Sequence, residues 1–182
     1  MKKTILLLAL IFTTSIAIAQ KYYTKTGSAT FEASVPAVEE VKATNSSTTA
    51  IINTTNGDFA ALVLVKGFRF KNALMEEHFN ENYAESDDFP KATFKGNITN
   101  FDISKLSEIA TNYTFSGTLT FHGKTKQLSN ERLALALVEG KIMVTGDFAV
   151  TVSDFDIKIP KVVSDKLSNN INVTYSFELN KK

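Results

Sequence analysis

Apolar and polar residues alternate along most of the chain, which is the pattern of β-strands that have one buried face and one face in water. Turn signals at Asn56-Gly57, His122-Gly123 and Glu139-Gly140 separate neighbouring runs and predict hairpins. Hairpins that follow one another along the chain predict an antiparallel sheet. The alternation is clearest in residues 112–121, 141–152 and 172–179, and shorter or less regular runs cover 29–33, 48–53, 59–70, 92–98 and 133–138.

Some segments depart from the alternation. Residues 72–79 contain helix formers with apolar side chains at helical spacing, which predicts a short helix. A second helical turn is expected directly after Pro160, because proline is tolerated in the first turn of a helix. The polar run 45–49 predicts a loop that leads into a strand.

About eight strands with one apolar face can stack as a sandwich or close as a barrel, and closure removes the exposed edges. Gly96, Gly117 and Gly146 each lie inside a predicted strand and on its apolar face. Glycine in such a place marks a bend, a barrel corner or a close approach to the backbone, so it either relieves bending or leaves room for a ligand. We therefore predict an all-β fold, an extended antiparallel β-barrel of about eight strands with one or two short helices.

The N-terminus has the order of a signal peptide. Two lysines precede the apolar run 5–12, and small residues follow up to Ala19, which predicts cleavage before Gln20. The apolar run is shorter than the roughly 20 residues that a membrane-spanning helix needs. We expect residues 20–182 to form a single domain that is periplasmic or secreted.

The amino-acid composition excludes several kinds of functional site. The chain has no cysteine, which excludes disulfides, thiol catalysis and cysteine-ligated metals. Its 20 basic residues nearly balance its 19 acidic residues, and this net balance suggests neither a nucleic-acid partner nor an anionic membrane surface. It has 14 phenylalanines and no tryptophan. Core packing explains most such rings, and an eight-stranded barrel is either filled by its side chains or holds one small ligand.

Two segments resemble the YceI-like family. Residues 78–94 contain a histidine and an apolar residue, a loop with serine and aspartate, and an aromatic-proline pair that opens a strand. Residues 116–126 read SGTLTFHGKTK, which is similar to the Gly-x-Leu-Thr-x-His-Gly-x-Thr-Lys motif of that family. The chain departs from the family at residues 75–77, where Met-Glu-Glu replaces an Arg-Asp pair, and in residues 31–34, which lack the His-containing strand.

The resemblance implies a lipocalin-like barrel, exported by a Gram-negative bacterium, that holds a polyisoprenoid or similar long-chain amphiphilic lipid in an apolar lumen. It implies no cofactor, no metal, no nucleic acid and no stable membrane insertion, and the protein could form a homodimer. The apolar lumen candidates are Phe94, Phe115, Leu119, Phe121, Leu135, Phe148, Val150, Tyr175 and Phe177. The polar candidates at the mouth of the barrel are Arg69, His78, Asn82 and His122.

Each polar candidate also has a structural explanation. His78 could hydrogen-bond a loop, His122 could stabilise its hairpin turn, and Arg69 could pair with a carboxylate. Tyr175 would need a partner for its hydroxyl inside a barrel. The lumen prediction would fail if the interior were filled by the protein's own rings.

Other functions remain open at this stage. A packed, ligand-free barrel with a structural or stress-related role is the main alternative. An enzyme that uses His78 and His122 is a weaker one, because the chain has no recognisable catalytic or metal-binding motif. An outer-membrane barrel shows the same period, but its apolar residues face outward.

Overall fold

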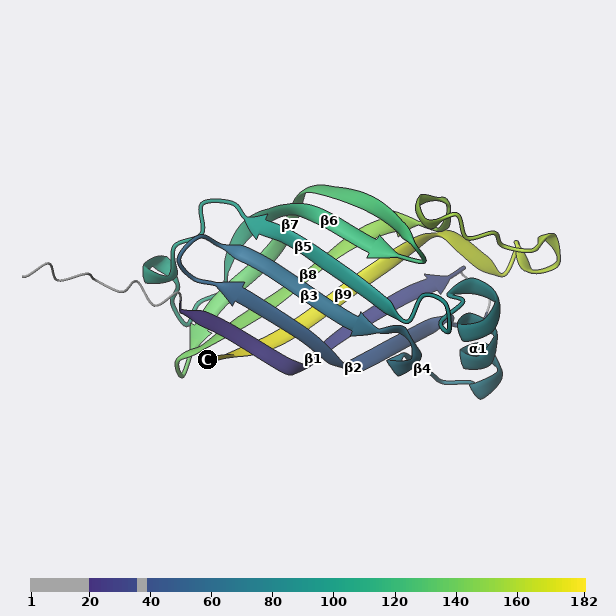
Figure 1. Ribbon diagram of the computed structural model, residues 1–182, viewed down its shortest axis with the longest axis horizontal. Coiled ribbons are helices and arrows are strands. Elements are labelled where there is room, and N and C mark those ends of the chain that lie inside the picture. The colour runs from purple at the N-terminus through teal and green to yellow at the C-terminus, as the bar shows by residue number, and fades with distance from the viewer. Residues whose placement is uncertain (1–19, 36–38) are drawn as a thin grey trace, which may run out of the picture.

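The alternating segments form nine β-strands in the computed structural model, which describes residues 20–35 and 39–182 (Figure 1). The predicted signal peptide, residues 1–19, lies outside the described residues. The strands are β1 Lys21–Ser34, β2 Lys42–Asn53, β3 Asp58–Leu64, β4 Arg69–Phe70, β5 Lys91–Ile98, β6 Thr111–Phe121, β7 Lys124–Val138, β8 Lys141–Thr151 and β9 Leu167–Lys181.

All strand pairings are antiparallel, and the sheet closes on itself because β1 pairs with both β9 and β2. Around the ring the order is β1, β2, β3, β5, β6, β7, β8 and β9, and the two-residue strand β4 is added to the start of β2. The predicted fold class, a closed antiparallel barrel of about eight strands, is confirmed.

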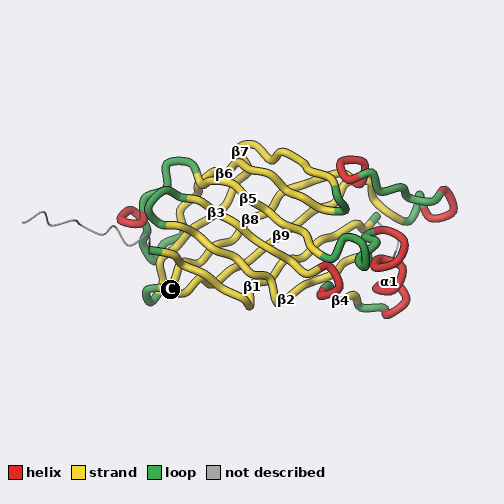
Figure 2. Tube along the Cα trace, viewed as in Figure 1, coloured by secondary structure: helices red, strands yellow, loops and turns green. Residues whose placement is uncertain are grey.

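The helical segments are short and lie at the ends of the barrel (Figure 2). The helix α1 covers Ala73–His78, where Asn72 accepts a hydrogen bond from the amide of Leu74, and a π-helical turn Phe79–Tyr83 continues it. The predicted short helix is confirmed, and the turn expected after Pro160 is the 3₁₀ turn Lys161–Val163. Further 3₁₀ turns cover Val65–Gly67, Ile103–Lys105 and Val152–Phe155.

The two ends of the barrel differ. One end, called the mouth end here, carries α1, the turns of residues 152–155 and 161–163, and the β6–β7 hairpin. The opposite end carries the turn of residues 103–105 and the β7–β8 hairpin. Phe101, Ile103 and Leu106 of the β5–β6 connection pack against the core at that opposite end, so we call it the closed end.

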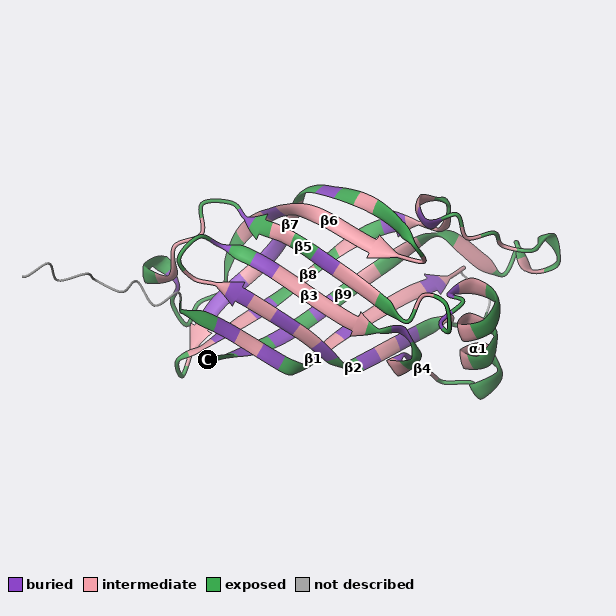
Figure 3. Ribbon diagram, viewed as in Figure 1, coloured by how far each residue is buried: buried purple, intermediate pink, exposed green. Residues whose placement is uncertain are grey.

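Alternation along each strand puts apolar side chains in the lumen and polar side chains outside, as the banding of buried and exposed positions shows (Figure 3). In β9, for example, Tyr175, Phe177 and Leu179 are buried, whereas Ser176 and Glu178 are exposed. The core is one cluster that spans all the long strands of the ring. The stability of the fold therefore depends on this shared interior.

The predicted hairpin turns are confirmed. Gly57, Gly123 and Gly140 all have positive φ, and so do His122 and Glu139, which precede two of these glycines. Two successive positive φ values are typical of the type I′ turns that join antiparallel strands of natural twist. The turns thereby fix the β6–β7 and β7–β8 pairings.

Several predicted boundaries are wrong. Residues 45–49 belong to β2 rather than to a loop, because β1 pairs with this part of β2. The side chain of Asn45 accepts from the amide of Ser47 and donates to the carbonyl of Leu64. The predicted run 59–70 is broken by the 3₁₀ turn between β3 and β4. At residues 45–49, strand pairing overrides local propensity.

The three mid-strand glycines make room for rings of the protein itself. Gly96 and Gly117 lie directly opposite each other, and a Cβ on either would come within 2.7 Å of the end of the Phe94 ring. A Cβ on Gly146 would collide with the ring and hydroxyl of Tyr175. The close approach anticipated from the sequence is therefore made by Phe94 and Tyr175, not by a ligand.

Candidate ligand-binding site

An apolar cavity of about 400 Å³ occupies the half of the barrel next to the mouth end. Its size falls within the usual range for small-molecule sites. The aromatic rings of Phe59, Phe94, Phe115, Tyr175 and Phe177 lie at its inner end, with neighbouring ring centroids 5.3–6.5 Å apart. These rings separate the open half of the lumen from the packed half, so the interior is neither solid nor empty throughout.

Most of the predicted lumen residues come together in this cavity. Eight of the nine line it: Phe94, Phe115, Leu119, Phe121, Phe148, Val150, Tyr175 and Phe177. Leu135 does not line it, because it lies near the closed end of β7, fully buried in the packed core and paired with Val144 of β8. Alternation places Leu135 on the correct face of its strand but does not report its depth along the barrel axis.

The hydroxyl of Tyr175 is buried in the lumen, where an unpaired polar group costs free energy. No hydrogen-bond partner for this hydroxyl exists among the described residues. Burial, together with the nearby carboxylates of Asp147 and Glu131, raises the pKa of Tyr175 above its ordinary value. The ring stays neutral, and it stacks on Phe177 with its centroid 5.3 Å away.

A second aromatic group lies at the mouth end of the cavity. Phe31 of β1, Phe68, Phe70 of β4 and Phe79 lie with ring centroids 5.0–5.9 Å apart and line the cavity. They attach α1 and its π-helical turn to the barrel rim. Sequence reasoning missed this group, because its members come from elements with different periods and meet only when the barrel closes.

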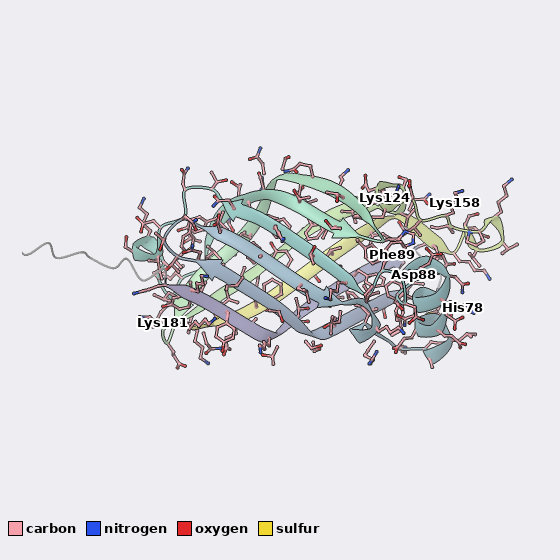
Figure 4. The ribbon with its side chains drawn as sticks, in the orientation of Figure 1. His78, Asp88, Phe89, Lys124, Lys158 and Lys181 are labelled. Carbon is pink, nitrogen blue, oxygen red and sulfur yellow. The ribbon has the colours of Figure 1, made fainter. Side chains whose placement is uncertain are left out.

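The predicted mouth residues all belong to mouth-end segments, but only His78 lines the cavity. His78 ends α1, exposed at the mouth (Figure 4). Asn82 is exposed on the π-helical turn. Arg69 is exposed and pairs with Glu76, with 2.9 Å between Nη1 and Oε1. This ion pair with a carboxylate holds α1 against β4 and is the structural role considered for Arg69 from the sequence.

His122 connects three mouth-end segments. Its side chain is only 14% exposed, with Nδ1 2.9 Å from the carbonyl oxygen of Phe155 and Nε2 2.8 Å from Oε2 of Glu85. Phe89 packs against the ring with centroids 4.7 Å apart. Because both hydrogen-bond partners are acceptors, both contacts form together only when both ring nitrogens carry a proton. His122 thus fixes the rim and does not face the cavity.

Other rim residues line the cavity without having been predicted. Lys166, at the end of the β8–β9 connection, and Glu39, before β2, bring charges to the entrance. Ile157 and Ile159 of the same connection add apolar surface. No periodic pattern marks these positions, since the segment is neither helix nor strand there.

Asp154 anchors the base of the β8–β9 connection. Its carboxylate accepts a hydrogen bond from Lys126 Nζ at 2.7 Å and another from the amide of Thr151 at 2.8 Å. The hydrogen bond from Lys126, followed by that from Thr151, lowers the pKa of Asp154 below its ordinary value. This carboxylate therefore links β7 to the end of β8.

Replacing Asp154 by asparagine should destabilise the fold by about 1–2 kcal/mol at neutral pH, since a hydrogen-bonded, paired carboxylate is lost. A depressed native pKa contributes stability that is present above about pH 4 and disappears as the pH falls through the native value. The difference between Asp154→Asn and the parent in urea unfolding should therefore shrink from pH 7 to pH 2.5. Asp156→Asn, which breaks an exposed pair with Lys124, is the control and should change little.

Two other features were sought in the described residues, a metal-binding cluster and a membrane-spanning helix. Within residues 20–35 and 39–182, no group of three or more histidine, aspartate or glutamate side chains is placed to hold a metal ion. Over the same ranges, none of the helices has the length and apolar character needed to cross a membrane.

The barrel resembles several solved structures over most of its length. A polyisoprenoid-binding domain from Saccharophagus degradans implicated in plant cell wall breakdown has a TM-score of 0.76 at 14% identity, with 90% of this chain and 99% of that chain covered. BcnA of Burkholderia cenocepacia has a TM-score of 0.63 at 12% identity, covering 84% and 95%. The YceI protein of Campylobacter jejuni has 0.61 at 18% identity, covering 80% and 87%. At these identities the similarity shows a shared fold.

The family assignment comes from the sequence match. No curated protein matches the chain significantly. The model of the YceI-like domain matches residues 16–179, which is nearly the whole chain and includes the segments 78–94 and 116–126. This match and the shared barrel agree, and the chain therefore belongs to the YceI-like family.

Proposed function

We propose that this protein binds a polyisoprenoid or a similar long-chain amphiphilic lipid, with the apolar tail inside the cavity. The observation that supports this proposal is the cavity itself, which is lined almost wholly by aromatic and aliphatic side chains and opens at one end. Each Å² of apolar surface removed from water contributes roughly 25 cal/mol, so a long tail needs no catalytic group to bind there. The solved relative from Saccharophagus degradans, a polyisoprenoid-binding domain, supports the same ligand class.

The polar end of the lipid would lie at the entrance. His78 and Lys166 line the cavity there and can donate hydrogen bonds to an oxygen-rich head group, whereas Glu39 would repel an anionic one that came close to it. His122 is committed to Glu85 and Phe155. We therefore propose a binding protein rather than an enzyme that uses His78 and His122.

The predicted signal peptide extends this proposal to a location and a role. An exported protein that encloses an apolar tail can carry a water-insoluble lipid through an aqueous compartment. We propose that the protein is a periplasmic or secreted lipid carrier. The alternative function, a packed barrel without a ligand, fits only the closed half of the lumen, because the half next to the mouth end contains the cavity.

Native mass spectrometry tests the proposal. Protein purified from the periplasm or medium of its own host, without detergent, should show an added mass, and organic extraction of the same sample should release an isoprenoid or another long-chain amphiphile. Empty protein in this experiment, together with failure to take up such lipids from detergent micelles, would reject lipid binding. If the lipid-loaded protein were recovered only from the cytoplasm, the proposed role as a periplasmic or secreted carrier would be rejected.

A further inference from the structure

The connection between β8 and β9 extends beyond the barrel rim at the mouth end, with the 3₁₀ turn Lys161–Val163 at its tip (Figure 1). Val162 on this turn has 83% of its surface exposed. On the other side of the same connection, Ile157, Ile159 and Val163 line the cavity. The segment therefore presents apolar side chains both to the cavity and to the surroundings of its entrance.

Exposed apolar residues concentrate at this end of the molecule. In the described part of the chain, four large apolar side chains are more than half exposed, namely Leu64, Leu74, Ile109 and Val162. Leu64 ends β3, Leu74 lies on α1 and Val162 lies on the connection, so three of the four belong to the mouth end. Ile109 lies at the closed end. Of these residues, only Val162 lies on the connection whose other side chains line the cavity.

The charge around Val162 indicates what that surface contacts. Lys158, Lys161 and Lys166 flank it and are exposed, and none of them forms an ion pair within residues 20–35 and 39–182. The connection has three aspartates, of which Asp154 is paired with Lys126 at 2.7 Å and Asp156 with Lys124 at 2.6 Å. Asp165 is then the one carboxylate of the connection left beside these three lysines, so the charge around Val162 is positive on balance. Lys158 and His78 lie at the same end of the molecule, with Lys181 at the other (Figure 4).

We propose that the segment of residues 157–166 is a docking loop that places the cavity entrance on an anionic lipid bilayer. Val162 enters the interfacial region, and Lys158 and Lys161 contact lipid phosphates. Lysines beside an inserted apolar side chain add attraction to an anionic surface, as in other peripheral membrane contacts. The α1 side of the rim carries Glu77, Glu81 and Asp88, all exposed, which restricts the contact to the docking loop.

This inference rests on the proposed function for its purpose, because a lipid carrier has to collect its ligand from a bilayer, but docking itself can be measured without any ligand. Purified protein is mixed with vesicles of phosphatidylcholine alone or with phosphatidylglycerol, and the bound fraction is determined by sedimentation. Binding should occur to the anionic vesicles at low salt and weaken as salt is added.

Variants separate the contribution of the lysine charges from that of the apolar side chain of Val162. Lys158→Glu with Lys161→Glu should reduce the affinity for anionic vesicles by about tenfold or more. Val162→Asp should reduce it by about tenfold. The matched controls are at the closed end, where Ile109→Asp, and Lys181→Glu with Lys182→Glu, should leave it unchanged. The proposal would be overturned if the control variants lost as much affinity for anionic vesicles, or if the parent protein bound neutral and anionic vesicles equally.

A spectroscopic measurement covers the case in which Val162→Asp does not fold. Because the chain has no cysteine, Val162→Cys can carry a single environment-sensitive fluorophore, with Ile109→Cys as its counterpart. The emission at position 162 should shift to shorter wavelength on anionic vesicles, and that at 109 should not. A shift that appears without vesicles as protein concentration rises would mean that Val162 contacts a second copy, and would overturn docking to a bilayer.

Loading experiments distinguish failure of docking from failure of the proposed function. Protein that takes up lipid from detergent micelles but never binds vesicles would retain the proposed function and reject the docking loop. Protein that binds vesicles but takes up no lipid from either source would retain docking and reject the proposed ligand.

Discussion

Leu119→Arg should reduce the lipid bound by the purified protein to below about a tenth of the parental amount, because a buried charge without a partner costs several kcal/mol. Leu119 lines the cavity, and it lies opposite Phe94 in the β5–β6 pair. The cavity is lined mainly by apolar side chains, and its one lining carboxylate, that of Glu39, lies at the entrance, so an arginine at position 119 would lie mostly among apolar neighbours. Native mass spectrometry after loading from micelles measures the bound fraction.

The control for this experiment is Thr118→Arg. Thr118 precedes Leu119 on the same strand and faces outward, where its hydroxyl donates to Gln127. This variant adds the same charge to the same strand and should keep parental loading. A folded Leu119→Arg protein that binds as much lipid as Thr118→Arg would show that the ligand does not occupy this cavity.

Gly117→Ala should destabilise the barrel by about 2–3 kcal/mol, a large fraction of the stability of a typical domain. The added Cβ would collide with the carbonyl of Lys95, with Cα of Gly96 at 2.5 Å and with the end of the Phe94 ring at 2.7 Å. Backbone atoms cannot rotate out of the way, so β5 and β6 must separate. Urea unfolding followed by circular dichroism measures the change in midpoint.

Gly140→Asn is the matched control for Gly117→Ala. A Cβ at Gly140 meets nothing within 4 Å, although its φ of +77° is left-handed, and asparagine tolerates that conformation better than most residues. The control should therefore cost much less than Gly117→Ala. If the two substitutions lowered the free energy of unfolding equally, the close contacts of Gly117 with Phe94 and β5 would not be the reason for the glycine at position 117.

The candidate site could be predicted only in part. Alternation identified Phe94, Phe115 and Leu119 as inward-facing, and all three line the cavity. The same rule included Leu135, which lies in the packed half. The second aromatic group, which consists of Phe31, Phe68, Phe70 and Phe79, was not predicted, because contacts between β1, β4 and the π-helical turn depend on closure of the barrel.

The sequence by itself determined which side of each strand faces inward, where the chief hairpins turn, where the short helix lies and which family the motifs resemble. These are local properties: a period of two residues, a pair of turn residues, a helix cap. Only the tertiary structure decided how far the lumen is filled, because depth along the barrel depends on strand tilt and on packing at the closed end. Phe101, Ile103 and Leu106 fill that end, and the rings of Phe59 and Phe115 mark where the cavity begins.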